Sequence, residues 1–249
     1  KQSIRQLAQK YLPRSVRWKL GQLEQWPPVG LVRYGSLRRL RPISDDWGSR
    51  RGLPIDRYYI ERFLARQAGD IRGQVLEVRD RSYTVRFGGD RVTHSDVLHK
   101  LPGNPEATIV ADLEAIPPAL PAETFDAIIC TQTLQFIYDV KTAVSTLYHS
   151  LKPGGVLLVT LPNIAQISPH DMAQWGDYWR FTSLAARRLF EERCPGAAVE
   201  VEAYGNVLTA VASLHGIASN ELRQRELDVA DPGYEFLISA RVQKPEAAQ

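Results

Sequence analysis

The sequence predicts an α/β protein built on a doubly wound, mostly parallel sheet of seven strands with helices on both faces. From residue 73 onward, short and continuously apolar segments alternate with segments of helical periodicity. That alternation is typical of parallel strands that are buried on both faces and joined by covering helices. Proline and glycine clusters separate the segments, as in LKPGG at 151–155, because neither residue readily continues a helix. The last two strands lie near the C-terminus, which leaves room for an antiparallel edge.

Seven short apolar runs are the expected strands. Each is bounded by polar or turn-forming residues, which is the usual setting of a buried strand. In chain order we expect these strands at 74–78, 90–97, 107–113, 125–132, 156–162, 198–204 and 234–243.

Helical periodicity fills the intervals between the strands. Pro54 suits the first turn of a helix over 53–68. The pair Gly88-Gly89 is expected to end a short helix before the second strand. Further helices are expected at 14–25, 138–151, 183–193 and 207–227.

Composition favours a globular protein. The 249 residues are 44% hydrophobic, and no run approaches the ~18 uninterrupted apolar residues that a membrane span needs. Cys130 and Cys194 lie in different elements, so we expect two free thiols, which fits a reducing cytoplasm. No His or Cys cluster has the spacing of a metal site, and we expect no metal.

The charge is unevenly distributed along the chain. Residues 1–66 carry 15 Lys+Arg against 5 Asp+Glu, a balance of +10, and the rest carries 16 against 23, a balance of −7. We therefore expect a basic N-terminal extension over 1–53, a main domain over 54–243 and a tail over 244–249. A basic arm suggests contact with a membrane surface, nucleic acid or a phosphorylated carrier. A solvated leader without a partner is the alternative.

The ends of the expected strands carry polar side chains. Ligands of open α/β sheets bind outside the carboxyl ends of the strands, and three successive ends each supply a carboxylate. Such a row suits a ligand with several hydroxyl and amino donors, such as an adenosine. The strand-end residues are Glu77, Val78, Arg79 and Asp80; Asp96; Asp112 and Leu113; and Thr131, Gln132 and Thr133.

These segments resemble a known family. The stretches LEV, SDV, ADLEAIP, FDAIICTQTL, LKPGGVLLVTLP and DYWRFT are similar to those of the class I S-adenosylmethionine-dependent methyltransferases. The resemblance covers about residues 50–243 and is closest to a compact subgroup found beside sugar-modifying genes. It implies a Rossmann-like fold, with S-adenosylmethionine as the cofactor.

The resemblance also implies roles for the strand-end residues. Glu77 and the turn behind it, from Val78 to Tyr83, would lie along the methionine and ribose. Asp96 would accept hydrogen bonds from the ribose hydroxyls, and Asp112 from the adenine amino group, with the Leu113 backbone nearby. Thr131, Gln132 and Thr133 would lie near the methionine. An Asp after a strand is also often only a helix cap or turn former.

The turn after the first strand departs from the family. Relatives have a glycine-rich turn, and this chain has Arg79, Asp80, Arg81, Ser82 and Tyr83. Either Asp80 and Tyr83 contact the cofactor in place of bare backbone, or cofactor binding is weakened. A methylsulfonium cofactor carries no phosphate, so it does not need the N–H groups that a glycine-rich loop presents.

The segment 165–182 is the expected roof of the site because it follows the fifth strand and is polar and aromatic. His170 is the expected base, with Asp171 or Asp177 as its orienting partner. A surface histidine in a loop is the alternative. From the helix opening, Tyr58 is expected to contact the cofactor and Arg51 the substrate. The expected substrate contacts in the roof are Trp175, Tyr178, Trp179 and Arg180.

The expected function is O-methylation of a sugar or another small polar metabolite, with a small molecule or glycan as substrate. A non-catalytic methyltransferase-like module that partners a glycosyltransferase is the alternative from another class. A nucleic-acid methyltransferase is disfavoured, since TQTL stands where an NPPY-type stretch is expected. Contact of the basic N-terminus with a membrane surface remains open.

Overall fold

The structure, a computed structural model, describes residues 13, 16, 22 and 26–247. The helix expected near 14–25 and the end of the tail lie outside the described residues. The chain divides into two units, Lys1–Arg41 and Pro42–Gln249. No helix among the described residues is long and apolar enough to cross a membrane.

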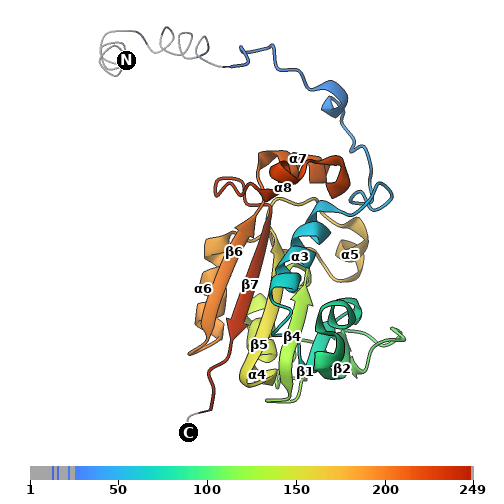
Figure 1. The fold of residues 1–249 in the computed structure, drawn as a ribbon, viewed down its shortest axis with the longest axis vertical. Helices are drawn as coiled ribbons and strands as arrows, with labels where there is room; N and C mark the ends of the chain where they lie inside the picture. Colours follow the sequence, from blue (N-terminus) through green and yellow to red (C-terminus); the bar gives the residue numbers. More distant parts are fainter. Residues whose placement is uncertain (1–12, 14–15, 17–21, 23–25, 248–249) are drawn as a thin grey trace. The chain divides into compact units, whose positions relative to one another are not determined.

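A seven-stranded sheet in the order β3-β2-β1-β4-β5-β7-β6 forms the centre of the second unit (Figure 1). Strands β1 to β5 pair in parallel, and β7 is antiparallel to both β5 and β6. The fold prediction is confirmed, including the antiparallel edge. The strands are β1 (Gly73–Val78), β2 (Val92–His99), β3 (Ile109–Val110), β4 (Phe125–Thr131), β5 (Leu151–Pro162), β6 (Ala198–Tyr204) and β7 (Leu237–Gln243).

Helices cover both faces of the sheet, because successive strand residues point to opposite faces. In β4, Ile128 packs in the core beneath α4 and α6, while Ile129 packs in the core beneath α3, α7 and α8. Both cores consist of buried apolar side chains. The helices are α3 (Ile55–Arg66), α4 (Val140–Ser150), α5 (Pro169–Gln174), α6 (Ser183–Arg193), α7 (Val207–Leu214) and α8 (Gln224–Asp228).

Local chemistry fixes several of these boundaries. The side chains of Asp139, Ser168 and Asn206 accept hydrogen bonds from the first turns of α4, α5 and α7, as N-cap residues do. A Cβ at Gly155 would lie 3.0 Å from the Phe125 carbonyl oxygen. This glycine therefore lets β5 begin against β4.

The helix expected over 207–227 is broken. It ends after Leu214, where Gly216 adopts a φ of 65°. The following residues instead contact the start of α3, with the Ser219 N–H donating to the Leu53 carbonyl oxygen. Tertiary contacts therefore override a continuous helical pattern.

The compact unit begins at Pro42, so residues 42–53 pack with the domain and not with the expected extension. The N–H groups of Ile43 and Ser44 both donate to the His215 carbonyl oxygen, at 2.9 and 3.0 Å. Cys130 and Cys194 are free and buried, as expected, and burial raises the pKa of each thiol to about 12.

Candidate active site

A cavity of about 730 Å³ lies at the carboxyl ends of the parallel strands; we call it the strand-end cavity. It brings together most of the residues that the sequence assigned to the cofactor. Its volume is in the ordinary range for a small-molecule site. The predicted residues that line it are Glu77, Val78, Arg79, Asp80, Tyr83, Asp112, Leu113, Thr131, Gln132, Thr133, His170, Asp171 and Trp175.

A second cavity of about 530 Å³ adjoins the first, and we call it the α5 cavity. Asp46, Asp56 and Gln135 line only this second cavity. The two cavities share a wall, so ligands in both would meet there. The shared residues are Arg57, Arg79, Gln132, Phe136, His170 and Asp171.

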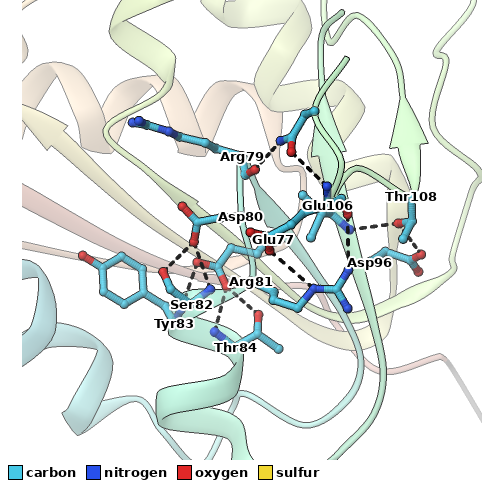
Figure 2. Close-up of polar contacts among 12 residues, drawn as sticks. Glu77, Arg79, Asp80, Arg81, Ser82, Tyr83, Thr84, Asp96, Glu106 and Thr108 are labelled. Atoms are coloured by element: carbon cyan, nitrogen blue, oxygen red, sulfur yellow. Dashed lines mark hydrogen bonds and ion pairs between the residues drawn. The ribbon is translucent and has the colours of Figure 1, made fainter. Parts of the chain in front are cut away.

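The Glu77 carboxylate is buried at the end of β1 and is held by the turn that follows. It accepts hydrogen bonds from the Tyr83 N–H at 3.2 Å and from the Thr84 N–H and hydroxyl, both at 2.7 Å (Figure 2). Burial nevertheless raises the pKa of Glu77 to about 7, although these hydrogen bonds oppose the shift. The buried Glu77 carboxylate therefore stabilises the turn after β1 through these hydrogen bonds.

Glu77 should make the stability of the protein depend on pH. The folded state binds its proton more tightly than the unfolded chain does, because its pKa rises from 4.5 to about 7. Folding stability is therefore lost as pH rises from about 4.5 to about 7, by about 3 kcal/mol in all. We expect urea unfolding across this pH window to show a smaller fall in stability for Glu77→Gln than for the wild type. Thr84→Val should show a larger fall, because it removes a hydrogen bond to the Glu77 carboxylate. Parallel curves for wild type and Glu77→Gln would contradict the assignment.

Arg79 gives the turn after β1 a conformation that glycine normally supplies. Its φ is 84°, which costs a non-glycine residue about 1–2 kcal/mol. Its N–H donates to the Leu98 carbonyl oxygen at 2.9 Å, and its carbonyl oxygen accepts from the Asn104 side chain at 2.6 Å. The side chain extends away from Asp80 and Ser82 (Figure 2). The turn therefore keeps a left-handed backbone without a glycine.

Gly88 and Gly89 lie apart from the cavity. Gly88 ends a helical turn over Thr84–Gly88, and Gly89 follows with a φ of 55°. The pair ends a short helix, as predicted, and lines neither cavity. A second strained residue does line the site: Gln132, after β4, has a φ of 45°. Such strain in non-glycine residues is concentrated at functional sites.

Asp112 follows β3 and faces the strand-end cavity. Its carboxylate accepts from the Glu114 N–H at 3.0 Å and forms an ion pair with Lys100 at 3.0 Å. Burial raises the pKa of Asp112, but these two partners outweigh burial and lower it overall. Asp112 is thus an ionised hydrogen-bond acceptor whose side chain is still 40% exposed. It stabilises the turn after β3 and also lines the strand-end cavity.

Asp96 lies away from both cavities, contrary to its expected place at a strand end. β2 continues to His99, and Asp96 pairs in register with Leu76 inside the sheet. Its carboxylate accepts from the Thr108 hydroxyl at 2.8 Å (Figure 2). It also accepts from the Gln74 amide at 3.2 Å. The strand end that faces the cavity is formed by Leu98, His99 and Lys100.

Tyr58 and Arg51 also lie outside both cavities. The Tyr58 hydroxyl accepts from Gln224 at 2.6 Å, and Arg51 forms an ion pair with Glu221. The neighbouring Arg57 lines both cavities instead and donates to the Tyr83 hydroxyl at 3.0 Å. The helix opening therefore faces the site as expected, but through a different residue.

The roof segment contributes α5 to both cavities. His170 and Asp171 lie in its first turn and line the shared wall. Asp171 accepts from the Ser168 hydroxyl at 2.6 Å. The Trp175 ring meets the His99 ring edge-on, with centroids 5.7 Å apart, so the end of α5 contacts the end of β2.

Asp177 and Arg180 form an ion pair that holds the roof. Arg180 donates to the two Asp177 carboxylate oxygens at 2.6 and 3.0 Å, and the Ser168 N–H donates to Asp177 at 3.1 Å. No hydrogen bond joins Asp177 or Asp171 to His170 within the described part of the chain, so neither is placed to orient it. Tyr178 and Trp179 pack against Tyr138 and line neither cavity.

The cavity residues that the sequence did not assign to the site include Arg57, Gln135, His99 and Lys100. Arg57 precedes Tyr58 by one position, and Gln135 belongs to the quoted stretch after β4. His99 and Lys100 end an apolar run, VLHK, that continues beyond Asp96. That run was the available sign that the second strand extends further.

Comparisons with known proteins agree with this fold. Residues 73–159 match the family described as a methyltransferase domain. No curated protein matches the sequence significantly. Many solved structures match it. A SAM-dependent methyltransferase from Archaeoglobus fulgidus is 13% identical, with a TM-score of 0.50 over 76% of this chain and 94% of that chain.

Two further structures are similar. A S-adenosylmethionine-dependent methyltransferase from Mesorhizobium loti is 14% identical over 76% of this chain and 98% of that chain, with a TM-score of 0.49. The N-methyltransferase NodS from Bradyrhizobium japonicum, in complex with S-adenosyl-L-homocysteine, is 15% identical over 82% and 95%, with a TM-score of 0.49.

The matched residues include β1, β2, β3, β4, α4 and most of β5. They contain most of the strand ends that line the strand-end cavity. Residues 73–159 therefore match a methyltransferase domain, and the chain shares its fold with a solved S-adenosylmethionine-dependent methyltransferase.

Proposed function

We propose that this protein transfers the methyl group of S-adenosylmethionine to an oxygen of a sugar or another small polar metabolite. The observation that carries the proposal is the pair of adjoining cavities with a shared wall at the ends of β1 and β4. Methyl transfer needs two ligands aligned at close range, and holding them so can supply much of the rate. The strand-end cavity would take the donor, and the α5 cavity would take the acceptor.

The strand-end cavity fits the cofactor. Asp112 offers an ionised carboxylate to the adenine amino group, and the left-handed turn at Arg79 lets the backbone approach the ligand. Gln132 and Thr133 would lie beside the methionine. Asp96, the expected ribose ligand, lies outside the cavity, so the ribose hydroxyls would meet His99 or Lys100 at the end of β2.

The α5 cavity suits an acceptor that is rich in hydroxyl groups. The Oε1 atom of Gln135 is buried and has no hydrogen-bond partner among the described residues. The Asp56 side chain is within 4.0 Å of Arg57, and burial raises its pKa. Both groups accept hydrogen bonds, and leaving the buried Gln135 oxygen unpaired is costly. Hydroxyl groups of a sugar would satisfy them.

S-adenosylmethionine supplies an activated methyl group, whose transfer to a hydroxyl oxygen breaks a carbon–sulfur bond, forms a carbon–oxygen bond and releases the hydroxyl proton. His170 lies in the shared wall, where it would accept that proton at an imidazole nitrogen. Arg57 and Arg79 lie in the same wall and would orient the anionic groups of either ligand.

Calorimetry tests the proposal at its first step. We expect the purified chain to bind S-adenosylmethionine and S-adenosylhomocysteine, because the cavity offers an ionised carboxylate and a suitable volume. The absence of heat with either compound at millimolar concentration would overturn the proposal. A screen of monosaccharides with the methyl-labelled cofactor then tests the acceptor.

Two aspartates on neighbouring strands provide a matched pair of variants. Asp112→Ala should weaken cofactor binding by about 10- to 150-fold, since a hydrogen bond to a charged group is worth about 1.5–3 kcal/mol. Asp96→Ala should lower the melting temperature and leave affinity unchanged, because the polar partners of its carboxylate among the described residues are Gln74, Thr108 and His94. If Asp96→Ala weakens cofactor binding and Asp112→Ala does not, the adenosine lies at β2 and not at β3.

A further inference from the structure

The segment 26–41, with the sequence WPPVGLVRYGSLRRLR, combines positive charge with exposed apolar side chains. It contains four arginines and no acidic residue. Its arginines are Arg33, Arg38, Arg39 and Arg41, and all four are exposed. The segment belongs to the first of the two units.

Several large apolar side chains of this segment are exposed. Trp26 is 89% exposed, Leu31 66%, Tyr34 56% and Leu40 fully exposed. Isolated exposed apolar residues are ordinary, but a contiguous group of them marks an interaction surface. Removing these side chains from water would be favourable for any partner that can receive them.

The backbone hydrogen bonds of the segment to other described residues form local turns. The Leu31 N–H donates to the Pro28 carbonyl oxygen at 2.9 Å, and the Leu37 N–H donates to the Tyr34 carbonyl oxygen at 3.0 Å. One helical turn covers Gly35–Leu37 and buries no residue. The segment therefore presents its apolar and basic groups together along a short, irregular stretch.

We propose that the 26–41 segment binds the surface of an anionic lipid bilayer. The arginines match lipid phosphates, and each basic residue near an anionic surface strengthens binding about fivefold. Trp and Tyr favour the region of the lipid headgroups, where Trp26 and Tyr34 would lie. Leu31 and Leu40 would enter the boundary of the acyl chains and leave water.

Nucleic acid is the competing partner for a basic segment, and the apolar composition argues against it. Single strands bind through phosphate contacts and through base stacking on aromatic rings. The exposed aliphatic side chains of Val29, Leu31, Val32 and Leu40 would gain nothing from stacking. They gain from transfer to an acyl environment.

Co-sedimentation of the full chain with vesicles tests the proposal. We expect binding to vesicles of equal parts phosphatidylcholine and phosphatidylglycerol, and little binding to phosphatidylcholine alone. The triple variant R33Q/R38Q/R39Q should lose about a hundredfold in partition coefficient. W26S/L31S/L40S should also lose binding. The matched control R72Q/R188Q/R225Q removes three exposed domain arginines and should bind as wild type does.

Each other outcome overturns the proposal. Equal binding to both kinds of vesicle would remove the electrostatic basis. An equal loss of vesicle binding in R72Q/R188Q/R225Q would show that binding depends on net charge and not on the 26–41 segment. Failure to bind the anionic vesicles, together with tight binding of a labelled oligonucleotide that the arginine triple abolishes, would assign the segment to nucleic acid. None of these outcomes bears on the cofactor calorimetry, so the two proposals fail separately.

Discussion

Replacing Asp177 with alanine is expected to lower the free energy of unfolding by about 2–4 kcal/mol, because it leaves a partly buried guanidinium without its carboxylate. The Asp177 side chain is only 2% exposed and binds Arg180 through both oxygens. It also accepts from the Ser168 N–H, so the same change frees the start of α5. Urea unfolding measures the first effect, and hydrogen exchange in α5 measures the second.

The sign of the pH dependence follows from the ion pair. Burial opposes ionisation of Asp177, but Arg180 and the Ser168 N–H outweigh it and lower the pKa below 3.8. The stabilisation is therefore complete at neutral pH and is lost only as pH falls below about 4, where wild type and variant should converge. Asp45→Ala is the matched control, since the Asp45 side chain is 82% exposed in its pair with Arg50, and it should cost less than about 1 kcal/mol. Equal losses in the two variants would contradict the assignment.

The sheet was predictable because its strands are continuous apolar runs. Ile128 and Ile129 are both fully buried, beneath helices on opposite faces of the sheet. Because both faces of the strand are covered, its sequence is continuously apolar and does not alternate between apolar and polar residues. The limits of strands were less predictable. In β2 the polar residues His94, Ser95 and Asp96 precede the apolar end. The sequence pattern therefore predicts a strand end beside Asp96, which in the structure lies within the sheet.

The side chains that reach the site depend on register and rotation, which sequence patterns do not fix. The Asp96 carboxylate accepts a hydrogen bond from Thr108, the residue just before β3. This contact depends on how β2 and β3 pair, which only the folded sheet defines. On α3, Tyr59 is buried and packs edge-on against Tyr58. This packing draws Tyr58 away from the cavity and leaves Arg57 facing it.

The turn after β1 shows a different limit. Glycine is the usual mark of a left-handed residue, and Arg79 adopts that conformation without being glycine. The cost is local, and contacts with Leu98 and Asn104 compensate it. These partners come from β2 and the loop after it, so no property of the turn sequence alone predicts the conformation.

His170→Ala is expected to reduce kcat by about 10²- to 10⁴-fold, the usual contribution of a general base. His170 lies in the wall that the two cavities share, where a methyl group would pass from donor to acceptor. Its loss should leave the affinity for S-adenosylmethionine unchanged, since Asp112 and the turn at Arg79 belong to other elements. Initial rates with a hydroxylated acceptor that the wild-type protein methylates measure the first effect, and calorimetry measures the second.

Asp56 is the competing base and provides the decisive comparison. Its carboxyl lines the α5 cavity, and burial raises its pKa, which brings a carboxylate closer to the strength that a base needs. It does not line the strand-end cavity, so it would bind an acceptor hydroxyl further from the donor. We therefore expect Asp56→Asn to raise KM for the acceptor more than it lowers kcat. If Asp56→Asn abolishes kcat while His170→Ala keeps it, proton removal belongs to Asp56, and α5 serves only to cover the two ligands.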